Sequence, residues 1–213
     1  MPDQIFETSQ ANILFQRLGI QPTNIQIRER PDRVFEFNEI MHGLEITDCS
    51  PTEYNYGQKI AREMYDQTGV PRCRDITDLQ HRENIRSREA IENSMFNSNG
   101  AIFQDATKLL ENWLQGAVDS ISGKREKFNA DPSAGTTPFE KFENNWLLVF
   151  DSVGLDECEP TYYELKNKLA DPALFRATEG EVDFDKIFIT SGKYTIIIED
   201  GKAILRHTDV SRP

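Results

Sequence analysis

Two acidic residues, Asp32 and Glu45, lie in neighbouring segments of the sequence that are predicted to pair. Residues 33–38 read RVFEFN and residues 40–48 read IMHGLEITD, and both segments alternate polar and apolar side chains as β-strands do. Asn38-Glu39 suits a tight turn, and pairing about this turn would place Asp32 beside Glu45. Two carboxylates that converge in this way would form a site for Mg²⁺, which binds a few carboxylate oxygens together with water and phosphate.

The alternation of residues 40–48 also predicts which side chains share a face with Glu45. Gly43, Glu45 and Thr47 are expected on one face of the strand, and His42, Leu44, Ile46 and Asp48 on the other. Since His42 points away from Glu45, we expect a satisfied or exposed histidine rather than a base. Asp48 is expected to cap the following helix together with Ser50.

The rest of the chain predicts an α/β protein with a mixed central sheet flanked by helices. Helices are expected at residues 4–19, about 50–68, 101–128 and about 160–170, and further strands at residues 23–29, 145–153, 184–190, 193–199 and 202–207. A turn at Asp200-Gly201 joins the last two strands into a C-terminal β-hairpin. The loop 129–138 is a candidate boundary, but the apolar strand after it needs a neighbour on each side, so we expect a single domain over residues 1–213.

The helix predicted at residues 101–128 contains a lysine within its apolar face. That face is formed by Phe103, Ala106, Leu110, Trp113, Ala117, Ile121 and Phe128, at spacings of three and four. Lys124 lies three residues after Ile121 and four before Phe128, on the same face. Lys127 lies about 80° from the centre of the face. Lys124 either extends its ammonium group past the apolar residues to solvent or serves a buried site, and both interpretations are open.

Pro31-Asp32, followed by a strand, a turn and the segment GLEIT with Glu45, resembles the restriction-endonuclease-like superfamily, the PD-(D/E)XK nucleases. The pattern of that superfamily is Pro-Asp, a variable gap, and then an acid, any residue and lysine. The chain is more similar to bacterial members with a PD…G-E-T signature, which continue with a long helix carrying spaced lysines and a WLL strand, here Lys124, Lys127 and Trp146-Leu147-Leu148. The resemblance covers about residues 5–150, and FDKIFIT fits the final strands.

This resemblance implies a restriction-endonuclease-like core and a Mg²⁺-dependent phosphodiesterase, a nuclease that cleaves DNA in restriction or phage defence. Asp32 and Glu45 would ligate Mg²⁺, or Mn²⁺ in its place, and the metal would polarise the scissile phosphate and supply a hydroxide nucleophile. Restriction-type relatives are commonly homodimers, so a homodimer is an alternative to a monomer.

Superfamily members often present an acid from the first helix to the metal, and Glu7 is the corresponding candidate here. Glu7 precedes Leu14 by seven residues and Leu18 by eleven, which places it on the apolar side of helix 4–19. The alternative is an exposed glutamate that the helix dipole favours in the first turn.

Thr47 stands where the superfamily pattern has lysine, so strand 40–48 lacks the cation that would stabilise charge in the transition state. One explanation is that the lysine has moved to another element, for which Lys124 is the catalytic candidate. The other is that activity is lost and the chain is an interaction module that keeps the nuclease fold. A third interpretation takes the fold as unrelated, with Asp32 and Glu45 as edge-strand charges that oppose aggregation.

The net negative charge of the chain bears on how it could bind nucleic acid. The 213 residues include 36 acidic and 24 basic residues, a formal charge of −12, which argues against a protein that coats nucleic acid non-specifically. His81 has no partner at a telling spacing. Residues 71–99 show only weak helical periodicity. The arginines of this segment are interspersed with acids and are expected on a solvated face; they are Arg72, Arg74, Arg82, Arg86 and Arg88.

Cysteine use and hydropathy indicate the compartment. Cys49, Cys73 and Cys158 are far apart and odd in number, so free thiols are expected rather than a disulfide framework or a zinc site. No apolar run approaches the roughly 20 residues that span a bilayer, and the first residues do not resemble a secretory signal. We therefore expect a cytoplasmic protein that makes no membrane contact.

Overall fold

The structure is a computed structural model that describes residues 4–49, 106–131, 139–151, 176–177, 180–191 and 194–207. Its elements are α1 (Gln4–Leu18), β1 (Thr23–Ile27), β2 (Arg33–Phe37), β3 (Ile40–Asp48), α5 (Ala106–Asn129), β4 (Asn144–Asp151), β5 (Lys186–Ser191), β6 (Tyr194–Glu199) and β7 (Lys202–His207). Several predictions fall outside the described residues: the helices near 50–68 and 160–170, Ser50, Phe103, His81, Cys73, Cys158 and the five arginines from 72 to 88.

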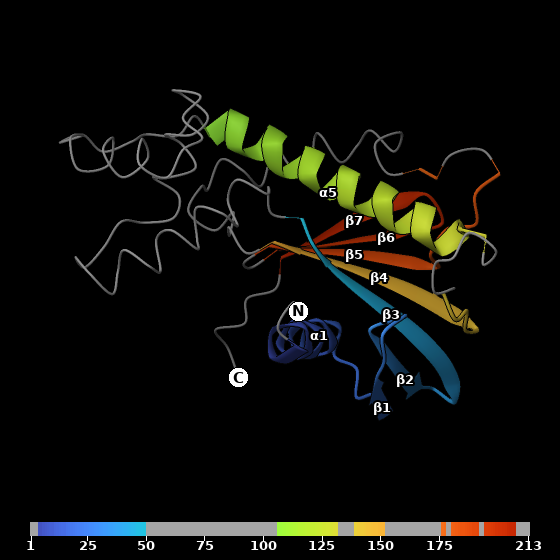
Figure 1. The fold of residues 1–213 in the computed structure, drawn as a ribbon. Helices are drawn as coiled ribbons and strands as arrows, with labels where there is room; N and C mark the ends of the chain where they lie inside the picture. The colour runs from blue at the N-terminus through green and yellow to red at the C-terminus, as the bar shows by residue number, and fades with distance from the viewer. Residues whose placement is uncertain are drawn as a thin grey trace, which may run out of the picture. The chain divides into compact units, whose positions relative to one another are not determined.

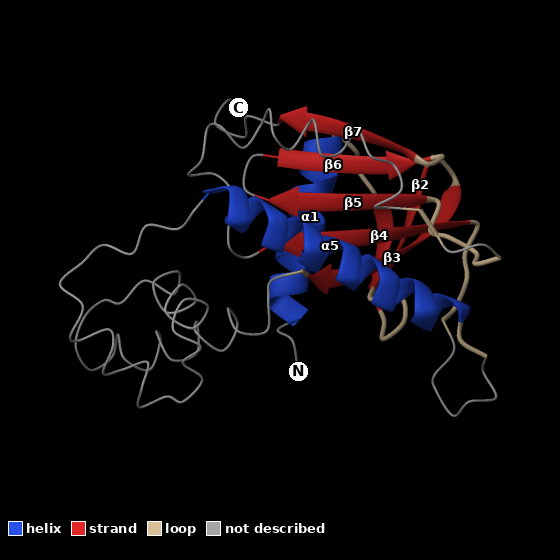
Figure 2. Cartoon of the chain, turned by 90° about the horizontal axis from the view of Figure 1, so that it is seen from above, coloured by secondary structure: helices blue, strands red, loops and turns tan. Residues whose placement is uncertain are grey.

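The strands of the described part form one mixed sheet in the order β1-β2-β3-β4-β5-β6-β7 (Figure 1), and Figure 2 shows β2 to β7 from above. β3, β4 and β5 are mutually parallel, and the remaining neighbours in the sheet are antiparallel. Parallel neighbours need a long crossover connection, and α5 lies in the connection from β3 to β4. The prediction of an α/β protein with a mixed sheet is therefore confirmed.

Helices cover both faces of this sheet (Figure 1). On the α1 face, a buried cluster joins Ala11, Leu14 and Phe15 of the helix to Phe35, Leu44, Ile46, Trp146, Leu148, Phe150, Phe188 and Ile197. Because strand side chains alternate between the two faces, the intervening residues of β3 and β4 point to α5. These include Glu45, Leu147 and Val149, all buried. β4 is thus buried on both faces, as its continuous apolar sequence predicts.

The β2–β3 turn has the backbone conformation that a tight hairpin needs. Asn38 has a φ of 54° and Glu39 a φ of 65°. Positive φ at both central residues gives a turn whose twist matches that of paired strands. The turn sets the register in which Arg33 pairs with Leu44. Asp32 therefore comes opposite Glu45, one residue before β2 begins, and the predicted hairpin is confirmed.

The contacts described below lie in one compact unit, formed by residues Met1–Cys49 and Gln115–Pro213. Most of the chain between these segments lies outside the described part, so the single domain over residues 1–213 stays a prediction. Among the helices that the structure describes, none has the length and apolar character needed to cross a membrane.

Candidate metal and acid–base site

Asp32 is fixed by a hydrogen bond from β3 to its side chain and by two further hydrogen bonds to its carbonyl oxygen. β2 begins at Arg33, opposite Leu44, so the residues of β3 from Glu45 onward have no partner in β2. There the Ile46 N–H donates to Asp32 Oδ2 at 2.7 Å. The Asp32 carbonyl oxygen accepts from the Arg28 N–H at 3.0 Å and from Arg33 Nη1 at 2.6 Å. These bonds fix both the position and the direction of the carboxylate.

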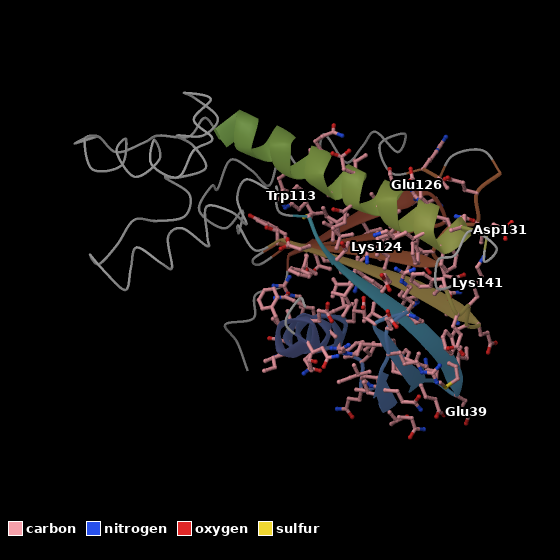
Figure 3. The ribbon with its side chains drawn as sticks, viewed as in Figure 1. Glu39, Trp113, Lys124, Glu126, Asp131 and Lys141 are labelled. Atoms are coloured by element: carbon pink, nitrogen blue, oxygen red, sulfur yellow. The ribbon has the colours of Figure 1, made fainter. Side chains whose placement is uncertain are left out.

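Glu45 is buried within the sheet and pairs with a lysine from α5. Its side chain is only 5% exposed and points from β3 toward the helix. Lys124 Nζ donates to Glu45 Oε1 in an ion pair. Figure 3 shows Lys124 on the side of α5 that faces the sheet, whereas the exposed Glu126 lies on the other side. The Lys124 side chain is 18% exposed, so this ion pair lies at the boundary between core and solvent.

The second oxygen of Glu45, Oε2, is buried and has no hydrogen-bond donor among the described residues. The Asp32 carboxyl group lies beside the Glu45 carboxyl group, close enough for a side-chain hydrogen bond between them. Because an ionised carboxylate only accepts hydrogen bonds, the two groups can bond each other only when one carries a proton. The pair therefore needs either a shared proton or a cation between its oxygens.

The electrostatics of the pair follow from burial first and from charges second. Burial raises the pKa of Glu45 to about 7; the Lys124 charge lowers this pKa and the Asp32 charge raises it. Burial also raises the pKa of Asp32, whereas the Ile46 N–H and the Lys124 charge lower it. Both acids therefore hold protons to higher pH than exposed carboxyl groups do.

A second basic residue, Arg33, joins the first turn of α1 to Asp32. The Arg33 side chain is 2% exposed. Its Nη2 donates to Thr8 Oγ1 at 2.7 Å and to the Gln4 carbonyl oxygen at 3.2 Å. Its Nη1 donates to the Asp32 carbonyl oxygen and lies 3.9 Å from Glu7 Oε2. One buried guanidinium group thus links the start of the helix to the acid pair.

Glu7 lies near the acid pair and is half-buried. Burial and the Asp32 charge raise the pKa of Glu7, whereas the Arg33 and Lys124 charges lower it. These interactions place Glu7 within electrostatic reach of the other charges, so three acids and two cations share this region. Its alternative as an exposed first-turn glutamate does not fit this burial.

The structure thus brings together the residues that the sequence singled out. Asp32 and Glu45 meet across the hairpin, and Lys124 reaches Glu45 from α5, while Lys127 is exposed. Thr47 is half-buried on β3 and supplies no charge. The interpretation of the acids as edge-strand charges is wrong, because β3 lies between β2 and β4 and Glu45 is buried.

His42 lies on the opposite face of β3 from Glu45, as the alternation predicts. Its ring stacks on Phe35 with centroids 5.1 Å apart and lies 4.6 Å from the Trp146 ring. Burial lowers the pKa of His42. The expectation of a satisfied histidine is confirmed for Nε2, which lies 3.4 Å from the Phe37 carbonyl oxygen, and wrong for Nδ1, which is buried without a hydrogen-bond partner in the described part of the chain.

Arg33 was not predicted as a site residue, although its place in the sequence of β2 carries a signal. Arg33, Phe35 and Phe37 alternate along β2 and share one face, which is the face that α1 covers. A buried arginine needs acceptors, and a position beside both the first helix and Asp32 supplies them. An arginine in phase with core residues is therefore a candidate for a charged contact inside the site.

The carboxylate oxygens of Asp32 and Glu45 suit Mg²⁺ as a partial set of ligands, to which water or substrate would add the rest. Glu45 Oε2 is a buried oxygen without a donor, and Asp32 stands beside it. Within the ranges that the structure describes, no three His, Cys, Asp or Glu side chains could together hold a metal ion. Mg²⁺ usually takes one or two carboxylates and completes its shell with water and phosphate oxygens. Two protein carboxylates are therefore a suitable set for an ion that is shared with a phosphate.

Comparisons of the chain with models of protein families, with curated proteins and with solved structures found no match.

Proposed function

We propose that the protein is a Mg²⁺-dependent phosphodiesterase of restriction-endonuclease-like fold that cleaves nucleic acid, with DNA as the substrate that its resemblance to PD-(D/E)XK nucleases implies. The observation that carries this proposal is the pair formed by the buried Glu45 and the half-buried Asp32, beside the Lys124 ammonium group. Burying two adjacent carboxylates is costly to a fold. A pair that needs a proton or a cation between its oxygens is typical of a functional site.

Each charged side chain has a role in this reaction. Asp32 and Glu45 would hold Mg²⁺, which when bound would polarise the scissile phosphate and lower the pKa of an attacking water. Lys124 would neutralise the negative charge that develops on the phosphate oxygens, because its ammonium group already lies at the partly exposed edge of the site. Arg33 would keep Asp32 in place through the Asp32 carbonyl oxygen.

Lys124 also accounts for the departure from the superfamily pattern at Thr47. The pattern puts a lysine on the same strand as the acid, two residues later. In this chain an ammonium group approaches Glu45 from α5, 79 residues away in the sequence. This contact supports a lysine that has moved from the strand to the helix.

The first test is calorimetric titration of Mg²⁺ and Mn²⁺ into the wild type, Asp32→Asn and Glu45→Gln. We expect wild-type binding in the millimolar range or tighter, as for sites with one or two carboxylates, and its loss in both variants. Glu36→Gln is the matched control, because Glu36 lies on β2 but bonds the exposed Asn24 side chain at 2.7 Å. A wild type that binds neither ion contradicts the proposal.

The second test is cleavage of plasmid DNA, single-stranded DNA and RNA with and without Mg²⁺. Lys124→Met is expected to lower kcat by about 100-fold or more, the usual effect of removing one transition-state donor, while metal binding is retained. Lys127→Met, an exposed lysine on the same helix, should have no effect. Cleavage that ignores Mg²⁺ and Glu45→Gln would come from a contaminant, and equal kcat values for Lys124→Met and the wild type would remove Lys124 from the mechanism.

A non-catalytic interaction module is the second candidate function. It is favoured by Thr47 and by the ion pair, because Lys124 already compensates the charge of Glu45 and no third ligand lies within the described residues. In this case the buried charges only specify how α5 docks on β3. The calorimetric titration separates the two candidates, since the module would bind neither Mg²⁺ nor Mn²⁺.

A further inference from the structure

α5 approaches the end of β3 very closely at Gly116. A Cβ atom at this position would lie 2.5 Å from the Cys49 carbonyl oxygen, inside the 3.4 Å at which ordinary van der Waals contact begins. The obstacle is backbone rather than a mobile side chain. The Cys49 N–H donates to the Phe150 carbonyl oxygen at 2.9 Å, so this backbone is tied to β4. Only glycine permits this approach without a shift of the helix or the strand.

The contacts between α5 and β3 continue from this glycine toward the candidate site. Ser120 Oγ donates to the Asp48 carbonyl oxygen at 3.4 Å, and Lys124 pairs with Glu45. The three helix residues are four apart and therefore share one face. The helix rises about 12 Å over the eight residues to Lys124, and β3 covers about 13 Å over the four residues from Cys49 to Glu45. The helix and the strand backbone therefore cover nearly the same distance between the Gly116 contact and the Lys124 contact.

We propose that Gly116 is a positioning residue for the candidate site, because it sets the depth at which α5 docks on β3 and so brings Lys124 to Glu45. An alanine at position 116 would need about 0.9 Å more room, the difference between 3.4 Å and 2.5 Å. A charged hydrogen bond holds its two heavy atoms about 2.7 to 2.9 Å apart, so a displacement of this size breaks it. The catalytic meaning of this inference rests on the proposed function, but the contact itself needs neither metal nor substrate.

Gly123 provides a matched control on the same helix. A Cβ atom at this position would meet no atom within 4 Å. Gly116→Ala and Gly123→Ala raise helix propensity by the same amount. The difference between the two variants therefore reports the contact with the Cys49 carbonyl oxygen.

The test measures the reactivity of Lys124 toward an amine-acetylating reagent, with the exposed Lys127 as internal reference. Cleavage after Glu126 places the two lysines on separate peptides for mass spectrometry. Gly116→Ala is expected to raise the ratio of Lys124 to Lys127 labelling about tenfold, which corresponds to about 1.4 kcal/mol of lost protection. Gly123→Ala should keep the wild-type ratio. A wild-type ratio in folded Gly116→Ala would overturn the proposal, because the long lysine stem would then have followed the helix.

This readout separates the positioning role from both general stability and the proposed function. A merely structural role would lower the Tm of Gly116→Ala and leave the labelling ratio unchanged. If the wild type binds no Mg²⁺, the labelling result still decides the role of Gly116; if it cleaves DNA, Gly116→Ala should lower kcat with little change in KM. If Gly116→Ala does not fold, the labelling ratio is measured in the double variant Gly116→Ala/Gly123→Ala, in which the second alanine stabilises the helix. Sucrose is added because it favours the compact state. A raised ratio supports the proposal and a wild-type ratio overturns it, as for the single variant.

Discussion

The protonation state of Glu45 depends on what lies beside it. With Asp32 as a neighbour and burial on all sides, the proton is retained to about pH 7, against the pull of the Lys124 charge. A divalent ion between the oxygens would replace this proton. Under the proposed function, the charge of Glu45 would therefore depend on whether the ion is bound, and this gives a test that needs no substrate.

The free energy of unfolding of the metal-free protein is predicted to fall as the pH rises through about 7. The pKa of Glu45 is about 7 in the folded protein and 4.5 for the unperturbed group, so the folded state binds more protons between these values. The stability contributed by the neutral carboxyl group is fully present below about pH 4.5. It is lost as the pH rises from there through 7, by roughly 3 kcal/mol, since the two pKa values differ by about 2.5 units at about 1.36 kcal/mol each.

Urea unfolding of the wild type and Glu45→Gln in the presence of a chelator measures this effect. Glutamine is neutral at every pH, so the wild type should lose stability relative to the variant between about pH 5 and pH 8. The comparison removes the contribution of His42, whose lowered pKa acts in both proteins alike. A difference that does not change with pH would show that Glu45 is not buried as a neutral acid.

At the scale of the elements, α1 and β2 are joined by a charge rather than by apolar contacts alone. Arg33 bonds the Gln4 carbonyl oxygen and Thr8 Oγ1 of α1 and the Asp32 carbonyl oxygen at the start of β2. A planar guanidinium group can serve several acceptors at once, whereas an ammonium group is a single point of charge. The position of Asp32 thus depends on the docking of α1.

Arg33→Met is predicted to lower the free energy of unfolding by about 3 kcal/mol, because it removes the three hydrogen bonds that the buried guanidinium group donates. Arg33→Lys should restore only part of this stability. Arg28→Met is the control, since Arg28 is 37% exposed and pairs with Glu140 at the surface, where an ion pair contributes about 0 to 1 kcal/mol. Equal losses for Arg28→Met and Arg33→Met in urea unfolding would contradict the buried link.

For the molecule as a whole, Mg²⁺ is predicted to raise the Tm more at pH 8 than at pH 5.5. A metal ion binds the deprotonated carboxylates, so protonation of Glu45 competes with it. With a pKa of about 7, apparent affinity should be about thirtyfold weaker at pH 5.5 than at pH 8. At pH 8 an ion at 100 times its Kd adds about 2.7 kcal/mol of stability.

Thermal unfolding of the wild type, Asp32→Asn and Glu36→Gln at both pH values checks this prediction. Glu36→Gln should behave as the wild type, and Asp32→Asn should show no shift in Tm with Mg²⁺. A shift of the same size at both pH values, or in Asp32→Asn, would place the ion elsewhere.

How far the sequence predicts this molecule depends on whether a feature is local. Alternation and the Asn38-Glu39 turn predict the hairpin that brings Asp32 opposite Glu45, because register in a hairpin follows from its turn. The apolar face of α5 places Lys124 toward the core in the same way. The strand order and the partner of Lys124 come from long-range packing, on which local periodicity carries no information.

The depth of helix docking could not be predicted for the same reason. Gly116 appears in the sequence as an ordinary helical glycine, like Gly123. The difference between them is a carbonyl oxygen from Cys49, 67 residues earlier in the chain. Likewise, the residues around Thr47 do not indicate that an ammonium group reaches Glu45 from α5. Such features depend on how elements that are distant in the sequence pack against each other.

The strand hairpin and the helix also differ in the chain length that each must close. Asp32 and Glu45 are 13 residues apart, whereas Lys124 is 79 residues from Glu45. Closing the longer segment costs roughly 1.6 kcal/mol more in chain entropy. The two acids are therefore the cheaper half of the site to assemble during folding. Until α5 docks, the repulsion between the two carboxylates is offset only by protons, solvent ions and the nearby Arg33 guanidinium group. A fully ionised pair therefore disfavours formation of the hairpin before the helix is in place.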